Sequence, residues 1–312
     1  MKMAFQNLRQ VVQTGRKKLS RRILHWRMRG RPEAEILTAE RKLRGVEQFD
    51  KLQAADIVVV SFGKSGRTWL RVMISHLFRV MYKLPENAIL GFDNFHNFNH
   101  AVPKTFFTHD NYIKDFTGDF HSKAPFYKKR VILLVRDPRD VAVSQYFQWK
   151  FRIKSTKVAI NNYPPMGTDI SVFDFVMGDN GGSLQAVSDY LNLWAGEASK
   201  VKNFHLVRYE DLRARPHEEL RKMLDFMRVE ATDAHVDAAV EYSSYENMKK
   251  MEGKEQFRFA GGRMMPRDKD NPNSYKVRRA KVGGYRDYFT DEEVAAIDHK
   301  LAETLAPLFN YQ

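Results

Sequence analysis

Residues 57–70, which read IVVVSFGKSGRTWL, are the segment whose residue types and spacing point most directly to chemistry. A run rich in β-branched apolar residues stops at Gly63, and KSG follows before a helix that we expect to begin near Thr68. A buried strand that turns through such a loop into a helix directs backbone N–H groups and the helix dipole at one point, where Lys64 adds a charge. The segment therefore predicts a binding site for phosphate or a chemically similar anion.

The spacing of this loop differs from that of the Walker A loop of nucleotide kinases and NTPases. A Walker A loop needs a glycine, four further residues and then Gly-Lys-Ser or Gly-Lys-Thr. Here Lys64 directly follows Gly63, and residues 59–62 contain no glycine. A P-loop nucleotide kinase or NTPase is therefore the less favoured enzyme alternative.

A second junction between a strand and a helix lies at residues 131–147. VILLV at 131–135 is typical of a buried strand, and RDPRDVAVSQYF follows it directly. A proline near a helix start and Arg136 beside the strand end suit a second anion site at a helix N-terminus. Arginine also carries a planar fork of donors, which favours bidentate contact with phosphate.

Five segments in order resemble the motifs of the PAPS-dependent sulfotransferase family, PAPS being 3′-phosphoadenosine 5′-phosphosulfate. KSGRTW at 64–69 resembles the family's 5′-phosphosulfate loop, and RDPRDVAVSQYF at 136–147 resembles its 3′-phosphate motif. FHLVRYEDL at 204–212 resembles the strand that ends in Tyr-Glu-Asp. EYSSYENMKK at 241–250 and RRAKVGGYRDYFT at 278–290 resemble the adenine-side segment and the C-terminal loop over the nucleotide. The chain is identified as a member of the cytosolic-type family, and we expect a bacterial member.

The resemblance implies which residues bind PAPS as the sulfuryl donor. Lys64 would contact the bridging oxygen and the leaving 5′-phosphate, and Trp69 would stack on adenine. Arg136 and Ser144 would clasp the 3′-phosphate. The family relies on cationic side chains here, so no metal ion is expected. The predicted PAPS-binding residues are Lys64, Ser65, Gly66, Arg67, Thr68, Trp69, Arg136, Ser144, Tyr209, Ser243, Tyr245, Arg278, Arg279 and Ala280.

His109 is the predicted general base, and with Lys64 it forms the predicted catalytic pair. Thr-His within KTFFTHDN at 104–111 matches the family's Lys-Thr-His segment. A histidine titrates near neutral pH and can take a proton from a hydroxyl or amine acceptor as the sulfuryl group is transferred in line. By composition alone, the alternatives are His96, His100, His121 and His205.

Three departures from the family pattern affect the predicted site. Phe107 stands where the family has a lysine two residues before the base, so one cation is missing. Arg67 stands where the family usually has threonine, and we hypothesise that it supplies the missing charge from the opposite side. Ala280 replaces a glycine, which costs little unless that position needs a positive φ.

Length, composition and pattern favour one α/β domain. The chain has 312 residues with 43% hydrophobic content, enough for one large domain. From residue 56 onward, expected strands (57–61, near 105–108, 131–135, 204–208) alternate with expected helices (68–82, 139–150, 184–199, 216–227, 233–240, 291–305). We predict a single P-loop-like domain at 51–312, with a mostly parallel central sheet flanked by helices, and a basic N-terminal helical extension at 1–50.

The basic excess of the chain is concentrated near its start. The formal net charge is +14, and residues 1–31 hold ten Lys and Arg with no Asp or Glu. If this segment is helical, Leu8, Val12, Leu19, Ile23 and Trp26 fall near one face, which favours docking to an anionic membrane surface. A solvated basic arm, a nucleic-acid-binding arm and a transit peptide are the alternatives. A basic peripheral membrane- or nucleic-acid-binding protein with a vestigial nucleotide site is accordingly the non-enzymatic alternative.

The acceptor is predicted only as a class: a small molecule, a lipid or a carbohydrate. We expect residues 85–110, 150–183 and 253–277 to build its site, with FDNFHNFNH at 92–100 suiting a partly apolar acceptor and 253–277 forming a lid. The chain has no cysteine, which excludes disulfides and thiolate metal sites. It also has no apolar stretch of the length that spans a bilayer. The expected location is cytoplasmic, with a peripheral membrane contact as a further expectation.

Overall fold

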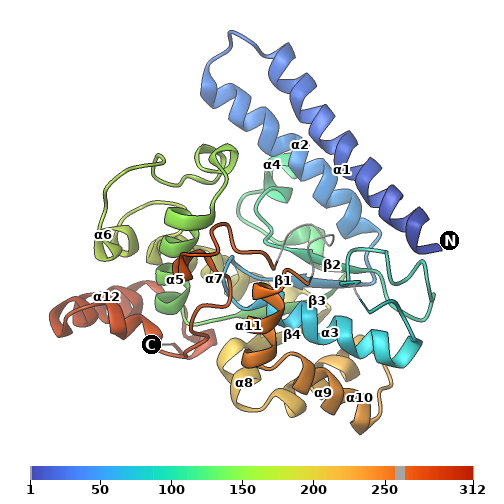
Figure 1. Cartoon of the computed structure of the whole chain (residues 1–312). Coiled ribbons are helices and arrows are strands. Elements are labelled where there is room, and N and C mark those ends of the chain that lie inside the picture. Colours follow the sequence, from blue (N-terminus) through green and yellow to red (C-terminus); the bar gives the residue numbers. More distant parts are fainter. Residues whose placement is uncertain (1, 87, 257–263, 312) are drawn as a thin grey trace.

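A parallel sheet of four strands forms the centre of the computed structural model, which describes residues 2–86, 88–256 and 264–311. The strand order is β2-β1-β3-β4, and every neighbouring pair is parallel. Helices surround this sheet on both sides (Figure 1). The predicted α/β class with a parallel central sheet is therefore confirmed. The strands are β1 (Ile57–Val60), β2 (Thr105–Thr108), β3 (Arg130–Val135) and β4 (Asn203–Arg208).

Both faces of the sheet are buried, because successive side chains of a strand point to opposite faces. Val58 and Val60 belong to one hydrophobic cluster, whereas Ile57 and Val59 belong to another. The first cluster includes side chains of α5 (Pro138–Arg152), α6 (Val172–Met177), α7 (Leu184–Glu197) and α12 (Asp291–Thr304). The second includes side chains of α3 (Arg67–Tyr82), α8 (Tyr209–Ala214), α9 (Pro216–Met227) and α10 (Asp233–Tyr242).

The connections of the sheet create a switch point between β1 and β3. From β1 the chain moves to β2 on one side, whereas β3 lies on the other side of β1 and leads on to β4. Ligands of such sheets bind beyond the carboxyl ends of the strands at this point. Lys64, His109, Arg136 and Tyr209 all follow strand ends at this same edge, the last three directly.

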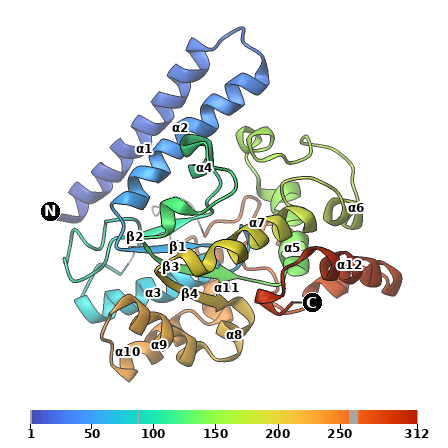
Figure 2. The same cartoon turned by 180° about the vertical axis from the view of Figure 1, so that it is seen from behind.

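A hairpin of two long helices projects from this domain: α1 (Lys2–Arg27) and α2 (Glu33–Gln53) (Figures 1 and 2). α2 packs against the short helix α4 (Ile113–Thr117). The guanidinium of Arg41 donates to both carboxylate oxygens of Asp115 at 2.8 and 3.0 Å and to the carbonyl of Ile160 at 2.6 Å. α2 therefore forms part of the domain wall. The predicted boundary at residue 50 falls inside α2, and the division of the chain there stays a prediction.

α1 packs on α2 through its charged face. Lys17 and Arg21 form ion pairs with Glu47, at 3.2 and 3.0 Å, and His25 contacts Glu40 at 2.8 Å. The apolar face points to solvent instead: Val12, Leu19, Ile23 and Trp26 are 47, 57, 41 and 74% exposed. The side chain of Leu8 lies outside the described part of the structure. No helix among the described residues is both long and apolar enough to cross a membrane.

The region after α10 forms a further helix, α11 (Tyr245–Gly253), which the sequence pattern did not predict. Residues 257–263 of the expected lid lie outside the described residues. The part that follows is held in place, because the buried carboxylate of Glu252 accepts from the N–H groups of Lys276 at 2.6 Å and Val277 at 2.8 Å. The guanidinium of Arg267 also donates to the carbonyl of Ile153 at 2.6 Å.

Candidate active site

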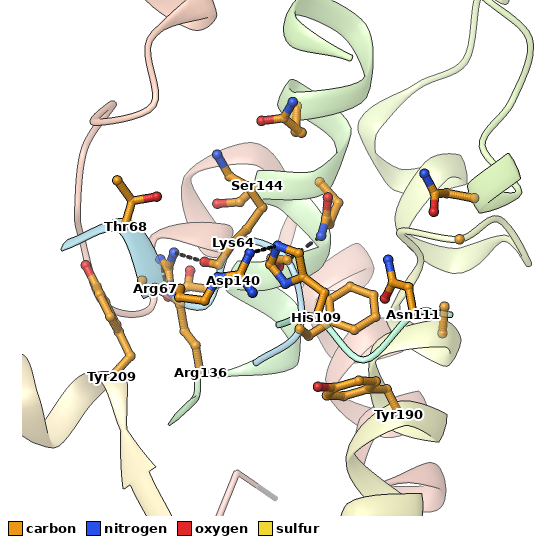
Figure 3. Close-up of a pocket in the computed structure, with 18 of the residues that line it drawn as sticks. Lys64, Arg67, Thr68, His109, Asn111, Arg136, Asp140, Ser144, Tyr190 and Tyr209 are labelled. Atoms are coloured by element: carbon orange, nitrogen blue, oxygen red, sulfur yellow. Dashed lines mark hydrogen bonds and ion pairs between the residues drawn. The ribbon is translucent and has the colours of Figure 1, made fainter. Parts of the chain in front are cut away.

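A cavity of about 1220 Å³ opens at the carboxyl ends of the strands. Figure 3 shows Lys64, Arg67, Arg136, Ser144 and Tyr209 converging on it from separate elements. Every predicted site residue lines the cavity except Ser65 and Ser243. The lining residues among those predicted are Lys64, Gly66, Arg67, Thr68, Trp69, His109, Arg136, Ser144, Tyr209, Tyr245, Arg278, Arg279 and Ala280.

The loop between β1 and α3 has the geometry expected of an anion site. Gly66 is the N-cap of α3, with φ 91°. No side chain caps this helix, and its first turn contains no acidic residue. The first N–H groups of α3 therefore have no capping side chain. A Cβ on Gly66 would lie 2.5 Å from the Tyr209 ring, so only glycine fits here. Lys64 is also in the left-handed region, with φ 74°, a conformation that costs a non-glycine residue about 1–3 kcal/mol. Ser65 is buried away from the cavity.

The second junction has a side-chain cap at its helix end. The sequence suits a second anion site at the N-terminus of α5, and in the structure the carboxylate of Asp137 caps this end by accepting from the N–H of Arg139 at 2.9 Å. That carboxylate also pairs with the Arg139 side chain at 2.8 Å, and the second anion site at this helix end stays a prediction. Arg136 and Ser144 do line the cavity, so the contribution of this junction comes from side chains.

Arg136 is held between several groups and still keeps one donor without an acceptor. Its guanidinium lies over the Tyr209 ring, 4.6 Å from the centroid, and pairs with Asp140 at 3.1 Å. It also donates to the carbonyl of Lys64 at 3.4 Å. Its Nε is buried and has no hydrogen-bond partner among the described residues. A buried donor without an acceptor is costly, which suits a group that binds an anion.

Positive charge dominates this half of the cavity. Burial and the neighbouring Lys276, Arg152, Arg278 and Arg136 hold the pKa of Lys64 well below its usual range. The cations that line this half are Lys64, Arg136, Arg213, Lys276, Arg278, Arg279 and Lys281. Within the described ranges, no group of three or more histidine and carboxylate side chains is placed to hold a metal ion.

Asp140, which sequence reasoning missed, anchors the C-terminal loop over this half. Its carboxylate accepts from the N–H of Gly283 at 3.0 Å and of Tyr285 at 2.9 Å. Within that loop, Arg278 lies over the ring of Phe147, 3.7 Å from its centroid. Ala280 has φ 50°, so this position does need the conformation that favours glycine. Arg279 pairs with Asp287 at 2.7 Å.

Trp69 is fixed on the side expected for adenine. Its Nε1 donates to the carbonyl of Ser243 at 2.7 Å, and its ring meets Tyr209 edge-on with centroids 5.7 Å apart. The hydroxyl of Ser243 is buried and donates to the carbonyl of Ala239 at 2.8 Å. Ser243 therefore positions Trp69 through its backbone, and its side chain does not reach the cavity. Tyr245 donates to the carbonyl of Arg278 at 2.9 Å.

His109 follows β2 and has both ring nitrogens engaged. Nδ1 lies 2.8 Å from the carbonyl of Ser61, so Nδ1 carries the proton and Nε2 carries the lone pair. Nε2 lies 2.5 Å from the guanidinium of Arg67 (Figure 3). Burial and the charge of Arg67 hold the pKa of His109 well below its usual range. The imidazole is therefore neutral at neutral pH, the form that a general base needs.

The other histidines are placed differently. His121 lines the cavity but is exposed, and His96 and His100 contact each other at 3.2 Å outside it. His205 on β4 stacks on Phe226 with centroids 5.3 Å apart. His109 is thus the histidine that lies at a strand end beside Lys64 and Arg136.

The acceptor half of the cavity differs from the expected one. Residues 106–110 line it, but the aromatic segment at 92–100 does not, because Phe95 is fully buried and Phe92 packs edge-on against Phe106. The expectation that this segment forms the acceptor wall was wrong. The lining residues that sequence reasoning missed include Arg41, Asn111, Lys114 and Tyr190, whereas Lys157 and Asn161 belong to the segment 150–183 that was expected to build the acceptor site.

Comparison with known families agrees with this site. The model of the family described as "Sulfotransferase domain" matches residues 54–308. The chain therefore belongs to the sulfotransferase domain family, and it is an enzyme of that class. The predicted family is confirmed.

Individual relatives are distant. Sulfotransferase 2A6 of Rattus norvegicus is 26% identical over 187 residues, 59% of this chain, and the match spans only 60% of that relative. Cytosolic sulfotransferase 10 of Arabidopsis thaliana is 23% identical over 287 residues, which cover 81% of this chain and 79% of the relative. Flavonol 3-sulfotransferase of Flaveria bidentis is 22% identical over 284 residues, covering 83% and 84%.

Solved structures share the fold. The structure of mouse sulfotransferase SULT7A1 complexed with PAP gives a TM-score of 0.54 at 18% identity, covering 86% of this chain and 91% of that one. A retinol dehydratase in complex with androsterone and inactive cofactor PAP gives 0.52 at 16% identity, covering 84% and 85%. At these identities the likeness shows the fold alone.

Proposed function

We propose that this enzyme transfers a sulfuryl group from PAPS to a hydroxyl or amine group of a small-molecule acceptor, with His109 as the general base. The observation that carries the proposal is the placement of Lys64, Arg136 and His109 beyond three neighbouring strand ends around one cavity. Two junctions between a strand and a helix carry cations, which suits a nucleotide with phosphates at its 5′ and 3′ positions. The third strand end supplies the general base.

The residues present fit such a donor. The buried Nε of Arg136 has no acceptor among the described residues, and the pKa of Lys64 is depressed by burial and by other cations. Both features are relieved when a polyanion binds, because an anion supplies an acceptor and restores the charged form of a lysine. In this arrangement the 5′-phosphosulfate would face Lys64 and the N-terminus of α3. The 3′-phosphate would face Arg136 and Ser144. The solved relative named above was complexed with PAP, the desulfonated form of this donor.

The chemistry needs a base and a charge that stabilises the leaving group. In our proposal, Nε2 of His109 removes the proton of the acceptor hydroxyl while the acceptor oxygen forms a bond to sulfur. The bond between sulfur and the 5′-phosphate oxygen breaks, and the electron pair stays on that phosphate. Lys64 neutralises the growing charge, so positioning and electrostatics carry the catalysis.

Arg67 is proposed to replace the cation lost at Phe107. The guanidinium of Arg67 lies beside the base, whereas Phe107 lies under the guanidinium of Arg71, which is 4.0 Å from the ring centroid. Arg71 does not line the cavity. In this proposal the replacement cation comes from the first turn of α3.

Incubation of the enzyme with labelled PAPS and fractionated small-molecule extracts, followed by mass spectrometry of labelled products, tests the proposal. We expect a product heavier by one sulfuryl group, formed with chelator present, and its loss in His109→Ala. An ATP-dependent product instead would support the kinase or NTPase alternative. Unchanged product formation in His109→Ala would contradict the assignment of the base.

We also propose that α1 docks on an anionic membrane surface. An amphipathic helix that packs by its charged face leaves an exposed apolar stripe, here made by Val12, Leu19, Ile23 and Trp26. Residues 1–31 carry ten Lys and Arg and no acidic residue, which complements anionic lipid headgroups. Charge complementarity therefore favours a lipid surface over a second copy of this basic helix.

Sedimentation with vesicles tests this contact. Full-length protein should bind phosphatidylglycerol-containing vesicles more tightly than pure phosphatidylcholine vesicles, and Ile23→Glu should weaken that binding about tenfold. Val80→Glu is the matched control, because Val80 on α3 is 42% exposed and Ile23 is 41% exposed. Equal loss in both variants, or a protein dimer that only Ile23→Glu disrupts, would contradict membrane docking.

A further inference from the structure

The acceptor half of the cavity is polar and basic. In Figure 3, Asn111 and Tyr190 lie on the opposite side of His109 from Lys64. The same half is lined by Lys114 of α4 and by Lys157 at the end of a short 3-10 helix, Ser155–Lys157. Aromatic side chains, including Phe106, Phe107 and Tyr190, line the cavity as well, and the two lysines add positive charge that points to the chemistry of the acceptor.

Lys157 and Lys114 have no carboxylate within ion-pair distance among residues 2–86, 88–256 and 264–311. Burial and the nearby Arg44 and Arg21 lower the pKa of Lys157. Burial, Arg41 and Lys123 likewise lower the pKa of Lys114. Asp115 and Asp110 act in the opposite direction on Lys114, but burial and the neighbouring cations outweigh them.

Two of the carboxylates nearby are already paired with other cations. Asp110 pairs with Lys123 at 2.7 Å, and both side chains are buried. Asp115 pairs with Arg41 at 2.8 Å. One further carboxylate that lines this half, Asp189, is exposed and accepts from Gln185 at 2.8 Å.

The backbone that carries Lys157 is held rigidly. Tyr112 donates to the side chain of Asn161 at 2.7 Å, and Asn161 donates in turn to the carbonyl of Lys157 at 3.0 Å. Arg41 of α2 fixes the same segment through the carbonyl of Ile160 at 2.6 Å. These contacts fix the backbone from which Lys157 projects, and its side chain is exposed.

We infer that the acceptor carries an anionic group, a phosphate, carboxylate or sulfate, in addition to the hydroxyl that receives the sulfuryl group, and that Lys157 binds it with support from Lys114. The inference rests on the proposed function, because it takes the half of the cavity beyond His109 as the acceptor half. The anionic group carries one or two negative charges, and it belongs either to a free metabolite or to a lipid headgroup.

Calorimetry on the full chain saturated with PAP isolates the acceptor half, because PAP occupies the donor half. The first pair of probes is glycerol 3-phosphate and glycerol. The second is dihexanoyl phosphatidylglycerol, below its micelle concentration, and dihexanoylglycerol. We expect the phosphate-bearing member of at least one pair to bind more than about tenfold tighter than its neutral partner. The pair with the larger preference for its phosphate-bearing member shows whether the acceptor is a soluble metabolite or a lipid.

Lys157→Gln should reduce that anion binding about tenfold or more while leaving PAP affinity within about twofold. Lys154→Gln is the matched control, because Lys154 is an exposed lysine of the same segment that does not line the cavity. It should leave anion binding within about threefold of wild type.

Three outcomes would overturn the inference: no preference for either phosphate probe, equal effects of the two variants, or loss of PAP affinity in Lys157→Gln. The last would place Lys157 at the donor. Failure of PAP to bind wild-type protein would count against the proposed function instead, so the two failures are distinguishable.

Discussion

The guanidinium of Arg67 lies 2.5 Å from Nε2 of His109, on the nitrogen that carries the lone pair. A base whose lone pair faces a cation cannot accept a proton until that cation moves. An anionic sulfuryl group is the natural alternative partner for the guanidinium. We therefore expect the arrival of the donor to release the base, which would couple proton removal to the presence of PAPS.

Replacing Arg67 with threonine should change the pH dependence of kcat/KM. Burial and Arg67 lower the pKa of His109, so in wild-type enzyme the neutral base persists below pH 6.5 and the acid limb lies below that pH. Arg67→Thr removes the charge, so the pKa rises and activity is lost at higher pH than in wild type. Turnover at neutral pH should also fall about tenfold or more, since one transition-state cation is lost.

Arg67→Lys is the control for this experiment, because it keeps the charge and should shift the acid limb less than threonine does. If the acid limb of kcat/KM lies at the same pH in Arg67→Thr as in wild type, the guanidinium does not influence the pKa of His109. Unchanged turnover would remove Arg67 from the proposed mechanism.

Binding of PAP should be accompanied by proton uptake at Lys64. The pKa of Lys64 is lowered by burial and by neighbouring cations, and an anion placed beside it raises that pKa again. Calorimetry at alkaline pH in two buffers of different ionisation enthalpy measures the protons exchanged. Lys64→Met should abolish most of the uptake. Equal heats in both buffers for wild-type protein would show that Lys64 is fully charged before PAP binds.

Gly66→Ala should damage the site more than the equivalent change at Gly118. Both glycines have positive φ, 91° and 77°, so alanine strains either position by about 1 kcal/mol. A Cβ at Gly66 would also lie 2.5 Å from the Tyr209 ring, whereas nothing lies within 4 Å at Gly118. Gly118→Ala should lower thermal stability slightly and leave PAP affinity intact. Equal PAP affinities of Gly66→Ala and Gly118→Ala would contradict the close contact between position 66 and the Tyr209 ring.

The two helices of the N-terminal hairpin should tolerate truncation differently. Removal of residues 1–31 deletes α1, whose described ion pairs to α2 are partly exposed and of small energetic value. Removal of residues 1–50 also deletes Arg41 and its partly buried pair with Asp115. We expect PAP affinity and melting temperature to change little in the first variant. The second should lose cooperative unfolding, and a stably folded form would contradict the role of α2.

The sequence predicted the parts of the site that directly follow strands. His109, Arg136 and Tyr209 come immediately after β2, β3 and β4, so recognising the strands placed these residues at one edge of the sheet. The loop around Lys64 was recognisable because its residue types and order are characteristic. Strands and helices with strong periodicity, such as α3 and α9, were predicted within one or two residues of their bounds.

Other features depend on tertiary contacts that the sequence pattern does not contain. Sequence reasoning assigned α2 to a helical extension outside the domain, because its buried face includes Glu40 and Arg44, which pair with each other and interrupt the apolar periodicity. The aromatic residues at 92–100 entered the core, since an aromatic side chain suits a core as well as a pocket. Lys157 lies within the segment 150–183 that was expected to help build the acceptor site, but no sequence pattern singled it out, and the fold brings it near His109.

Comparison of PAP with adenosine 5′-phosphate tests the central claim most directly, because the two nucleotides differ only in the 3′-phosphate. We predict that wild-type enzyme with chelator present binds PAP more than about tenfold tighter than adenosine 5′-phosphate, and that Arg136→Ala removes this preference. A preference for PAP that persists undiminished in Arg136→Ala would contradict the assignment of the two strand ends to opposite phosphates.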